Sequence, residues 1–502
     1  MRVTPARLRS RRTIAPQTRT MITGTGVVAL ILVVASVTLD ALRFDVIIGV
    51  LTLLSLVLAT IPLLRRVTRS VGDPAFAETL YWALGLKFVF TLIRYFFIAV
   101  IYNDNGDAGV YSATGAILME LYRKGTFTLE APGLGGRGLE TARISVVVGL
   151  IYVVTGVSRY AASFVFSWLC FLGQLMMFRA FHRGVPEGDL RRYGVLIFFL
   201  PSLLFWPSSI GKEALMIFFI GFVCYGAAQL LGAQAQATGV LTFLAGAAGL
   251  FYIRPHMALI SIVALAFAAA VSTVMGFSEV EDKKANSKTF AIRMTALALL
   301  IIGGSVATTQ LSKVFGDGTD SAGVTAVLDR TKAQTSEGGS QFAAPAVTSP
   351  QAIPWAVVTV LLRPFVWEAH NANGMIAASE GVLFIGLLAV GRRRLVSWAH
   401  YIGRRPYLVF ASAYAMTFII AFSYIGNFGI LARQRTQMIP LALTLLAMPV
   451  AARKRSSMFG GRRRKNAVSL ERQHVEAPLL AGVAADSTSP RPDPLPRSET
   501  QP

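Results

Sequence analysis

Long apolar runs dominate this sequence and limit what it can fold into. A helix needs about twenty mostly apolar residues to cross the roughly 30 Å hydrocarbon core of a membrane. Runs that reach or approach this length lie near residues 21–40, 46–64, 76–102, 158–180, 193–208, 213–232, 237–253, 257–276, 294–312, 372–391, 406–425 and 436–452. We therefore expect an all-α, polytopic transmembrane bundle of about twelve helices over residues 21–452.

Composition agrees with a membrane location. Of the 502 residues, 54% are hydrophobic and only 15% are charged, too few to cover the surface of a soluble chain. The net charge of +22 is concentrated in short clusters between apolar runs, where membrane topology needs it, so we expect no nucleic-acid partner. The two cysteines lie inside apolar runs, which excludes a disulfide scaffold and a Cys-based zinc site.

The positive charges predict the orientation, because basic residues favour the cytoplasmic side. The N-terminal segment 1–20 contains arginines and no acidic residue. With this segment inside, every large basic cluster also falls inside; the clusters are residues 65–69, 179–192, 283–293, 392–405 and the tail from 453. We expect an uncleaved, multi-pass protein of the inner (cytoplasmic) cell membrane with both ends in the cytoplasm.

The remaining segments fall outside the regular crossings. Two weaker runs, 144–157 and 353–366, are too short to span comfortably, so we interpret them as re-entrant or interfacial helices on the outer face. Two long outer loops are expected at about 103–143 and 313–352. The tail 453–502 is basic and then rich in Pro and Ser, which predicts disorder.

Two acidic residues begin the first outer loop. Asp104 and Asp107 directly follow an apolar run, and a carboxylate at this depth can act as a general base toward a hydroxyl group. The alternative is an Asn/Gly turn that ends a helix, with both aspartates solvated. Lys87 and Arg94 lie in the preceding run; they are either pore charges or cations packed against an acid.

Four further groups of ionisable residues lie at the expected outer boundary. Lys212 and Glu213 begin a helix after a Pro-broken crossing, and a helix N-terminus favours phosphate. The other candidates for binding a phosphate-linked substrate are Arg254, His256, Arg363, Glu368, Arg433 and Arg435. Snorkelling of Lys212, complementation of the helix dipole by Glu213 and headgroup anchoring by the arginines are the alternatives. Anchoring to lipid headgroups explains a single arginine on the outer side well. Four arginines on this disfavoured side are better explained by a basic cavity.

Cofactor motifs are not evident. No Walker A or G-x-G-x-x-G element follows a strand, and no HExxH motif occurs. The five histidines are scattered. We therefore expect no cofactor, and nothing in the sequence supports a divalent metal.

Several short motifs carry a family resemblance. The element Asp107-Ala108-x-x-Tyr111-x-x-x-Gly115 resembles the acidic motif of GT-C-type polytopic membrane glycosyltransferases. Trp-Pro-Ser-Ser-x-Gly-Lys-Glu at 206–213, Arg-Pro-His at 254–256 and Arg-x-Arg at 433–435 are similar to bacterial exopolysaccharide and O-antigen repeat-unit polymerases. The chain departs from the oligosaccharyltransferase pattern, because it lacks a second acidic metal-binding motif and a large C-terminal outer domain.

This resemblance implies sugar transfer from a polyprenyl-phosphate-linked donor during polysaccharide assembly in the cell envelope. Asp107 would be the base with Asp104 in support, and Tyr111 would belong to the substrate site. The implied partners are the lipid-linked donor, membrane lipids and other polysaccharide-assembly proteins. A repeat-unit polymerase, a transporter or flippase of lipid-linked glycan, and a non-catalytic assembly subunit remain alternatives.

Overall fold

A computed structural model describes residues 44–102, 106–129, 139–232, 237–274, 341–343, 347, 349–370 and 372–450. The chain divides into two units, Met1–Val450 and Ala451–Pro502, and all described residues belong to the first. The predicted N-terminal segment 1–20, the apolar runs 21–40 and 294–312, and the predicted tail 453–502 lie outside the described residues. So does most of the predicted loop 313–352.

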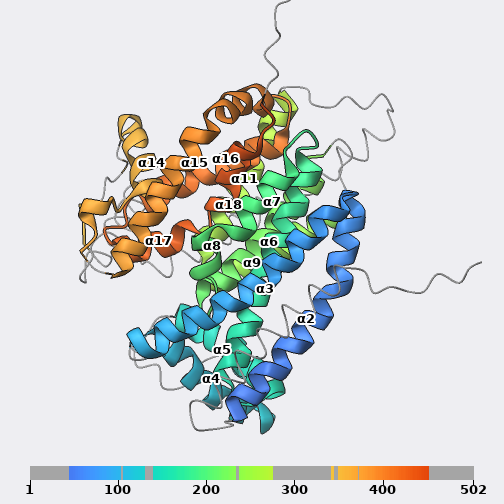
Figure 1. The fold of residues 1–502 in the computed structure, drawn as a ribbon, viewed down its shortest axis with the longest axis vertical. Coiled ribbons are helices and arrows are strands. Elements are labelled where there is room, and N and C mark those ends of the chain that lie inside the picture. Colours follow the sequence, from blue (N-terminus) through green and yellow to red (C-terminus); the bar gives the residue numbers. More distant parts are fainter. Residues whose placement is uncertain are drawn as a thin grey trace, which may run out of the picture. The chain divides into compact units, whose positions relative to one another are not determined.

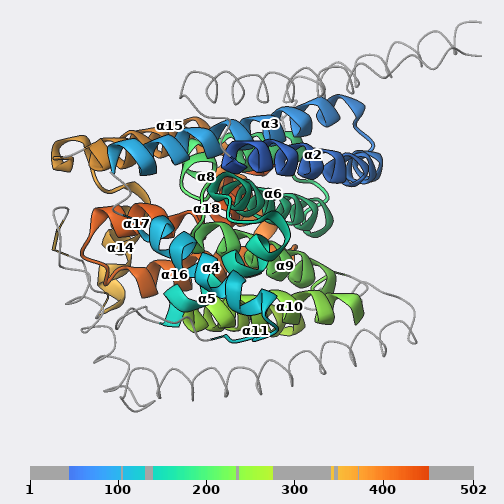
Figure 2. The same cartoon turned by 90° about the horizontal axis from the view of Figure 1, so that it is seen from below.

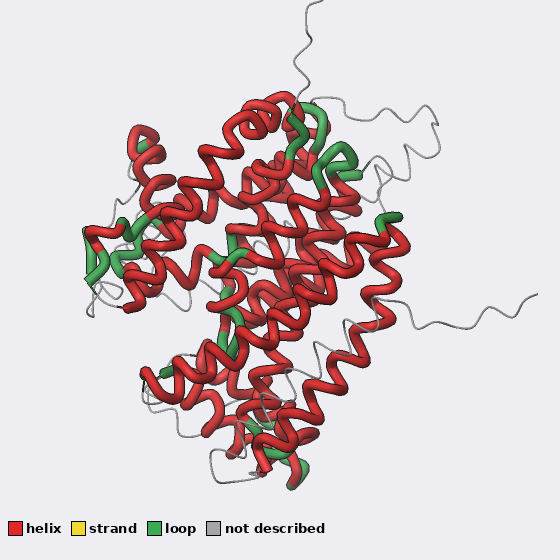
Figure 3. The backbone as a smooth tube through the Cα atoms, in the orientation of Figure 1, coloured by secondary structure: helices red, strands yellow, loops and turns green. Residues whose placement is uncertain are grey.

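The described part of the chain is helical throughout and contains no strand, which confirms the all-α prediction (Figures 1 and 3). Gln341 and Asn427 form an isolated antiparallel β-bridge. The α-helices are α2 (Phe44–Val71), α3 (Pro74–Phe96), α4 (Asp107–Arg123), α5 (Leu139–Thr155), α6 (Arg159–Gly184), α7 (Leu190–Phe199), α8 (Pro201–Phe205), α9 (Lys212–Leu230), α10 (Ala237–Ile253), α11 (Pro255–Val274), α14 (Ile353–Leu362), α15 (Ala372–Ile402), α16 (Pro406–Phe422), α17 (Phe428–Arg435) and α18 (Ile439–Ala442).

Six segments of the described chain are long and apolar enough to cross a membrane. They are Phe44–Val71, Phe76–Ile101, Arg159–Gly184, Lys212–Leu230, Pro255–Val274 and Gly374–Ile402. These segments indicate a multi-pass membrane protein. The expected total of about twelve crossings stays a prediction.

Helices α6 and α9 form the centre of the described bundle (Figure 2). A Cβ atom added at Gly173 would lie 2.3 Å from the backbone oxygen of Ile217, and one added at Gly221 would lie 2.4 Å from the oxygen of Gly173. The two backbones therefore approach as closely as small residues allow, as is typical of helices packed within a membrane. Helices α2 and α3 pack on α6, and α10 packs on α9.

The crossing predicted at 193–208 is broken. Helix α7 ends at Phe199, and Pro201 begins α8, because a proline cannot continue the hydrogen-bond ladder of the preceding helix. Lys87 of α3, which is fully buried, donates from Nζ to the carbonyl oxygen of Leu203 at 2.9 Å. This bond ties the broken helix to α3. The segment 206–211 then runs without regular helix to the start of α9.

The described residues of the predicted outer loop 103–143 include α4 and the beginning of α5, so this segment is largely helical, and its place on the outer face stays a prediction. Residues that recur at helical spacing on α4 are buried, including Ala108, Tyr111, Leu118 and Tyr122. The Gly, Ser and Thr residues between them make the segment less apolar than a membrane crossing. A search for apolar runs therefore does not detect this helix.

Three other apolar runs differ from regular crossings. Run 144–157 lies mostly in α5, which has 17 residues. Run 353–366 lies mostly in α14, which has 10 residues and extends about 15 Å, too short to cross the hydrocarbon core. Run 436–452 is not one helix as predicted; it contains α18 and the 3-10 helix η4 (Leu443–Ala447), with Pro440 inside α18.

Candidate functional site

A cavity of about 500 Å³ collects most of the predicted site residues. Its walls come from α3, α4, the segment before α9, the junction between α10 and α11, and α17. The predicted residues that line it are Asp107, Tyr111, Lys212, Glu213, Arg254 and Arg433. These residues are far apart in the sequence, and the fold brings them to one place.

The packing of α4 on α5 positions Asp107. Asp107 is the first residue of α4, and the buried Tyr111 lies one turn later. The side chains of Ser112 and Tyr152 share a hydrogen bond of 2.7 Å between the two helices. A Cβ atom added at Gly115 would lie 2.6 Å from Cγ1 of Val148, so this glycine allows the close approach of α4 to α5. This packing places Asp107 at the cavity wall.

Two helix N-termini open onto the cavity. Helix α4 begins after Gly106 and α9 after Gly211, and neither glycine supplies a side-chain cap. Both glycines line the cavity. The first backbone N–H groups of a helix are unpaired within the helix and carry a partial positive charge, so such an end favours an anion. Lys212 adds a full positive charge at the start of α9.

Arg254 lies where α10 ends and α11 begins. Its side chain is buried, and Nη1 donates a hydrogen bond to Oε1 of Gln434. Gln437 donates to the same oxygen at 2.6 Å. This network links the Arg254 junction to α17, whose first turn is capped by the Asn427 side chain. Arg433 of α17 lines the cavity and donates from Nε to the oxygen of Gly429 at 3.3 Å.

Arg94 of α3 also lines the cavity, although it is not among the predicted site residues. Its side chain is 8% exposed and lies against aromatic rings, with Cζ 4.7 Å from the ring centroid of Phe205 and 5.1 Å from that of Trp206. The sequence signal that could have identified Arg94 is the presence of a charged residue within an apolar run. Its position in the run did not reveal which side of the bundle it faces.

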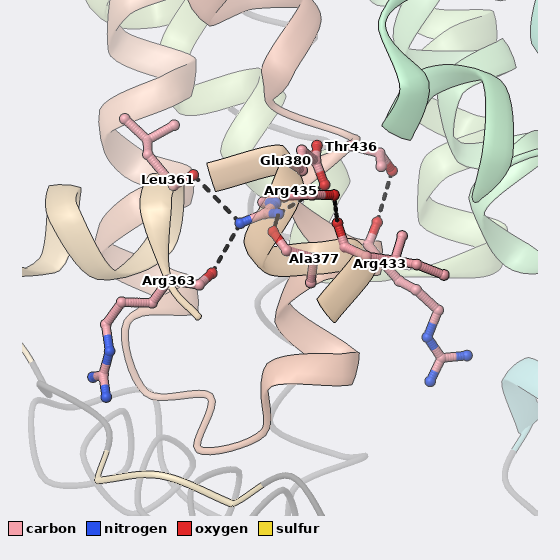
Figure 4. Close-up of polar contacts among 9 residues, drawn as sticks. Leu361, Arg363, Ala377, Glu380, Arg433, Arg435 and Thr436 are labelled. Atoms are coloured by element: carbon pink, nitrogen blue, oxygen red, sulfur yellow. Dashed lines mark hydrogen bonds and ion pairs between the residues drawn. The ribbon is translucent and has the colours of Figure 1, made fainter. Parts of the chain in front are cut away.

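Arg435 does not line the cavity, contrary to the predicted phosphate contact. It is fully buried, and its guanidinium forms an ion pair of 2.7 Å with Glu380. It also donates to the backbone oxygens of Leu361, Arg363 and Ala377 (Figure 4). Arg433 points away from this cluster in the same view. Because the residues alternate around the short helix, one arginine faces the cavity and the other stabilises the fold.

Arg363 and Glu368 form a second ion pair, and neither lines the cavity. Arg363 Nη2 lies 2.5 Å from Glu368 Oε1, and its Cζ lies 4.6 Å from the ring centroid of Phe342. Burial alone would raise the pKa of Glu368, but the hydrogen bonds from Arg363 and from the Phe365 backbone outweigh it, so the pKa lies below its ordinary value. This pair organises the segment between α14 and α15.

Of the two remaining predicted site residues, His256 does not line the described cavity. His256 follows the α10–α11 junction, with its ring centroid 5.9 Å from that of Phe422. Asp104 lies outside the described residues. Within the described part of the chain, no group of three or more His, Cys, Asp or Glu side chains could hold a metal ion, so the expectation about metals stays a prediction.

Fold and site together define an all-helical protein with membrane-spanning segments and a cation-rich cavity that also holds carboxylates. Comparison of the chain with protein-family models, with characterised proteins and with solved structures finds no match. The functional argument therefore rests on the residues of the cavity.

Proposed function

We propose that this protein is a membrane glycosyltransferase that uses polyprenyl-phosphate-linked sugars in cell-surface polysaccharide assembly. The observation that carries the proposal is the presence of Asp107 in the same cavity as Lys212, Arg254 and Arg433. In this proposal the chain crosses the inner membrane about twelve times with both ends in the cytoplasm. The cavity then opens at the outer face.

The reaction that these residues support is the attack of an acceptor hydroxyl on the anomeric carbon of the donor sugar. Asp107 takes the hydroxyl proton as the new carbon–oxygen bond forms. The bond between the anomeric carbon and the phosphate oxygen breaks, and that oxygen leaves with the electron pair. Lys212, Arg254 and Arg433 stabilise the negative charge that develops on the phosphate.

The distribution of charge favours an enzyme over a transporter or flippase. A transporter needs polar groups along a path through the bilayer. Here Lys212, Arg254 and Arg433 gather in one cavity beside a carboxylate, whereas the buried Lys87 is bonded to the Leu203 backbone and ties two helices together. A repeat-unit polymerase is the narrower alternative within the same class, with an oligosaccharide as the transferred group.

Donor turnover by the purified protein in nanodiscs tests the proposal. A panel of polyprenyl monophosphate and diphosphate sugars is supplied with a glycan acceptor, and transferred sugar is measured. The proposal expects transfer from at least one donor. Binding of a donor without transfer, together with its movement across proteoliposomes, would instead support the flippase.

A further inference from the structure

The described cavity is lined by Arg94, a cation whose hydrogen-bonding capacity is only partly used by its contact with Tyr102. Nε and Nη1 of Arg94 are buried and have no hydrogen-bond partner among the residues that the structure describes. A guanidinium carries five donors, and a buried donor without an acceptor is costly. The rings of Phe205 and Trp206 stabilise the positive charge but accept no conventional hydrogen bond from it.

The charges that line the cavity are not balanced. Arg94, Lys212, Arg254 and Arg433 supply four positive charges, and Asp107 and Glu213 supply two negative charges. The cavity therefore has an excess of two positive charges before either helix N-terminus is considered. An anion with two charges matches this excess better than an anion with one.

We infer that the cavity takes a diphosphate-linked substrate, with Arg94 as a phosphate-binding residue. The inference rests on the proposed function and narrows its donor class. A lipid–diphosphate–sugar ester carries two negative charges, and the corresponding monophosphate ester carries one. The guanidinium of Arg94, in which Nε and Nη1 have no acceptor among the described residues, suits hydrogen bonding to a phosphate group. The remaining cations and the N-terminus of α4 then serve the other phosphate.

Arg94 lies on a different helix from the other cations of the cavity, so its contribution can be tested separately from theirs. Arg94 belongs to α3, whereas Lys212, Arg254 and Arg433 belong to α9, the α10–α11 junction and α17. The cavity has a volume of about 500 Å³, which two phosphate groups and a sugar can occupy.

Binding of the glucose esters of geranyl diphosphate and geranyl monophosphate to the protein in phosphatidylcholine nanodiscs tests the inference. The wild type is expected to bind the diphosphate at least tenfold more tightly than the monophosphate. Arg94→Gln should remove most of this preference while changing monophosphate affinity only a few-fold. Arg94→Lys keeps the charge but not the planar fork, so it should retain an intermediate preference.

The control is Arg143→Gln, which removes a guanidinium that lies 5.3 Å from the Tyr252 ring and outside the cavity wall. It should leave the preference unchanged. The inference is overturned if Arg94→Gln keeps the wild-type ratio, or if it weakens both ligands equally. Retained monophosphate binding shows that the variant is folded.

The failure of this inference differs from the failure of the proposed function. Diphosphate preference that depends on Arg94, without sugar transfer from any donor, would remove the proposed activity and keep the ligand. Sugar transfer from monophosphate donors alone would keep the activity and remove the diphosphate assignment.

Discussion

At the residue scale, Arg435 and Glu380 form the most deeply buried ion pair in the described part of the chain. The Arg435 side chain is 0% exposed and that of Glu380 is 4% exposed. Removing one partner of a buried pair leaves an uncompensated charge, which typically costs about 3–5 kcal/mol. We predict a loss of this order for Glu380→Ala, measured as a reduced melting temperature and denaturant midpoint in detergent.

The control is Asp73→Ala, which removes the partner of Arg191. That arginine is 67% exposed, and an ion pair exposed to solvent contributes little to stability. Equal destabilisation by the two variants would contradict the assigned role of the buried pair.

Glu368 predicts a pH-dependent contribution to stability. Its folded-state pKa lies below the ordinary value of 4.5, because the hydrogen bonds from Arg363 and the Phe365 backbone outweigh the effect of burial. A depressed pKa stabilises the fold above the ordinary pKa, and this contribution is lost as the pH falls through the folded-state value. The wild type should therefore melt above Glu368→Gln at pH 7, with the difference shrinking below about pH 4.5. A difference that stays constant down to pH 3 would show that the Glu368 charge does not stabilise this segment.

The sequence identified most ionisable residues of the candidate cavity but could not sort them. Arg433 and Arg435 are two positions apart, and only the helix geometry separates a cavity residue from a buried structural cation. Arg363 and Glu368 formed a plausible binding pair in sequence, yet they pair with each other in the fold. Arg94 could not be assigned to the cavity from the sequence, because that assignment depends on how α3 faces the broken segment at 206–211.

At the element scale, the crossing of α6 and α9 depends on Gly173. A Cβ atom at this position would meet the Ile217 backbone, which cannot move aside as a flexible side chain could. We predict that Gly173→Ala destabilises the protein by about 1–3 kcal/mol, the usual cost of overpacking. Thermal unfolding in detergent measures this change.

Gly386→Ala is the matched control, because Gly386 is also helical and has nothing within 4 Å of an added Cβ atom. It should leave the melting temperature nearly unchanged. Comparable melting of the two variants would show that α6 and α9 are not held at this distance.

Element boundaries also show where sequence reasoning ends. Long uniform runs predicted α2, α3, α6, α9 and α11 well, because lipid-compatible helices need sustained hydrophobicity. Helix α4 is rich in small and polar residues, and its burial depends on α5, so the run-length argument assigned it to a loop. Proline breaks at 201 and 440 interrupt runs whose overall hydrophobicity is continuous.

At the scale of the whole molecule, the proposed topology places the turn after α4 outside and the turn after α15 inside. Thr126 and Arg404 are exposed at these two turns. The native Cys170 and Cys224 are buried, so a membrane-impermeant maleimide should react mainly with an introduced cysteine. In intact cells, Thr126→Cys should label directly, whereas Arg404→Cys should label only after permeabilisation. The reverse pattern would invert the topology.

The central claim is that Asp107 acts as the base in sugar transfer, and its most direct test compares two carboxylates on α4. Asp107 lines the cavity, whereas Glu120 is exposed on the same helix and outside the cavity wall. We predict that Asp107→Asn reduces the rate of sugar transfer by about 10²–10⁴-fold in nanodiscs, while donor binding persists and Glu120→Gln retains the wild-type rate. Transfer by Asp107→Asn at the wild-type rate would contradict the account and leave the cations of the cavity without their proposed base.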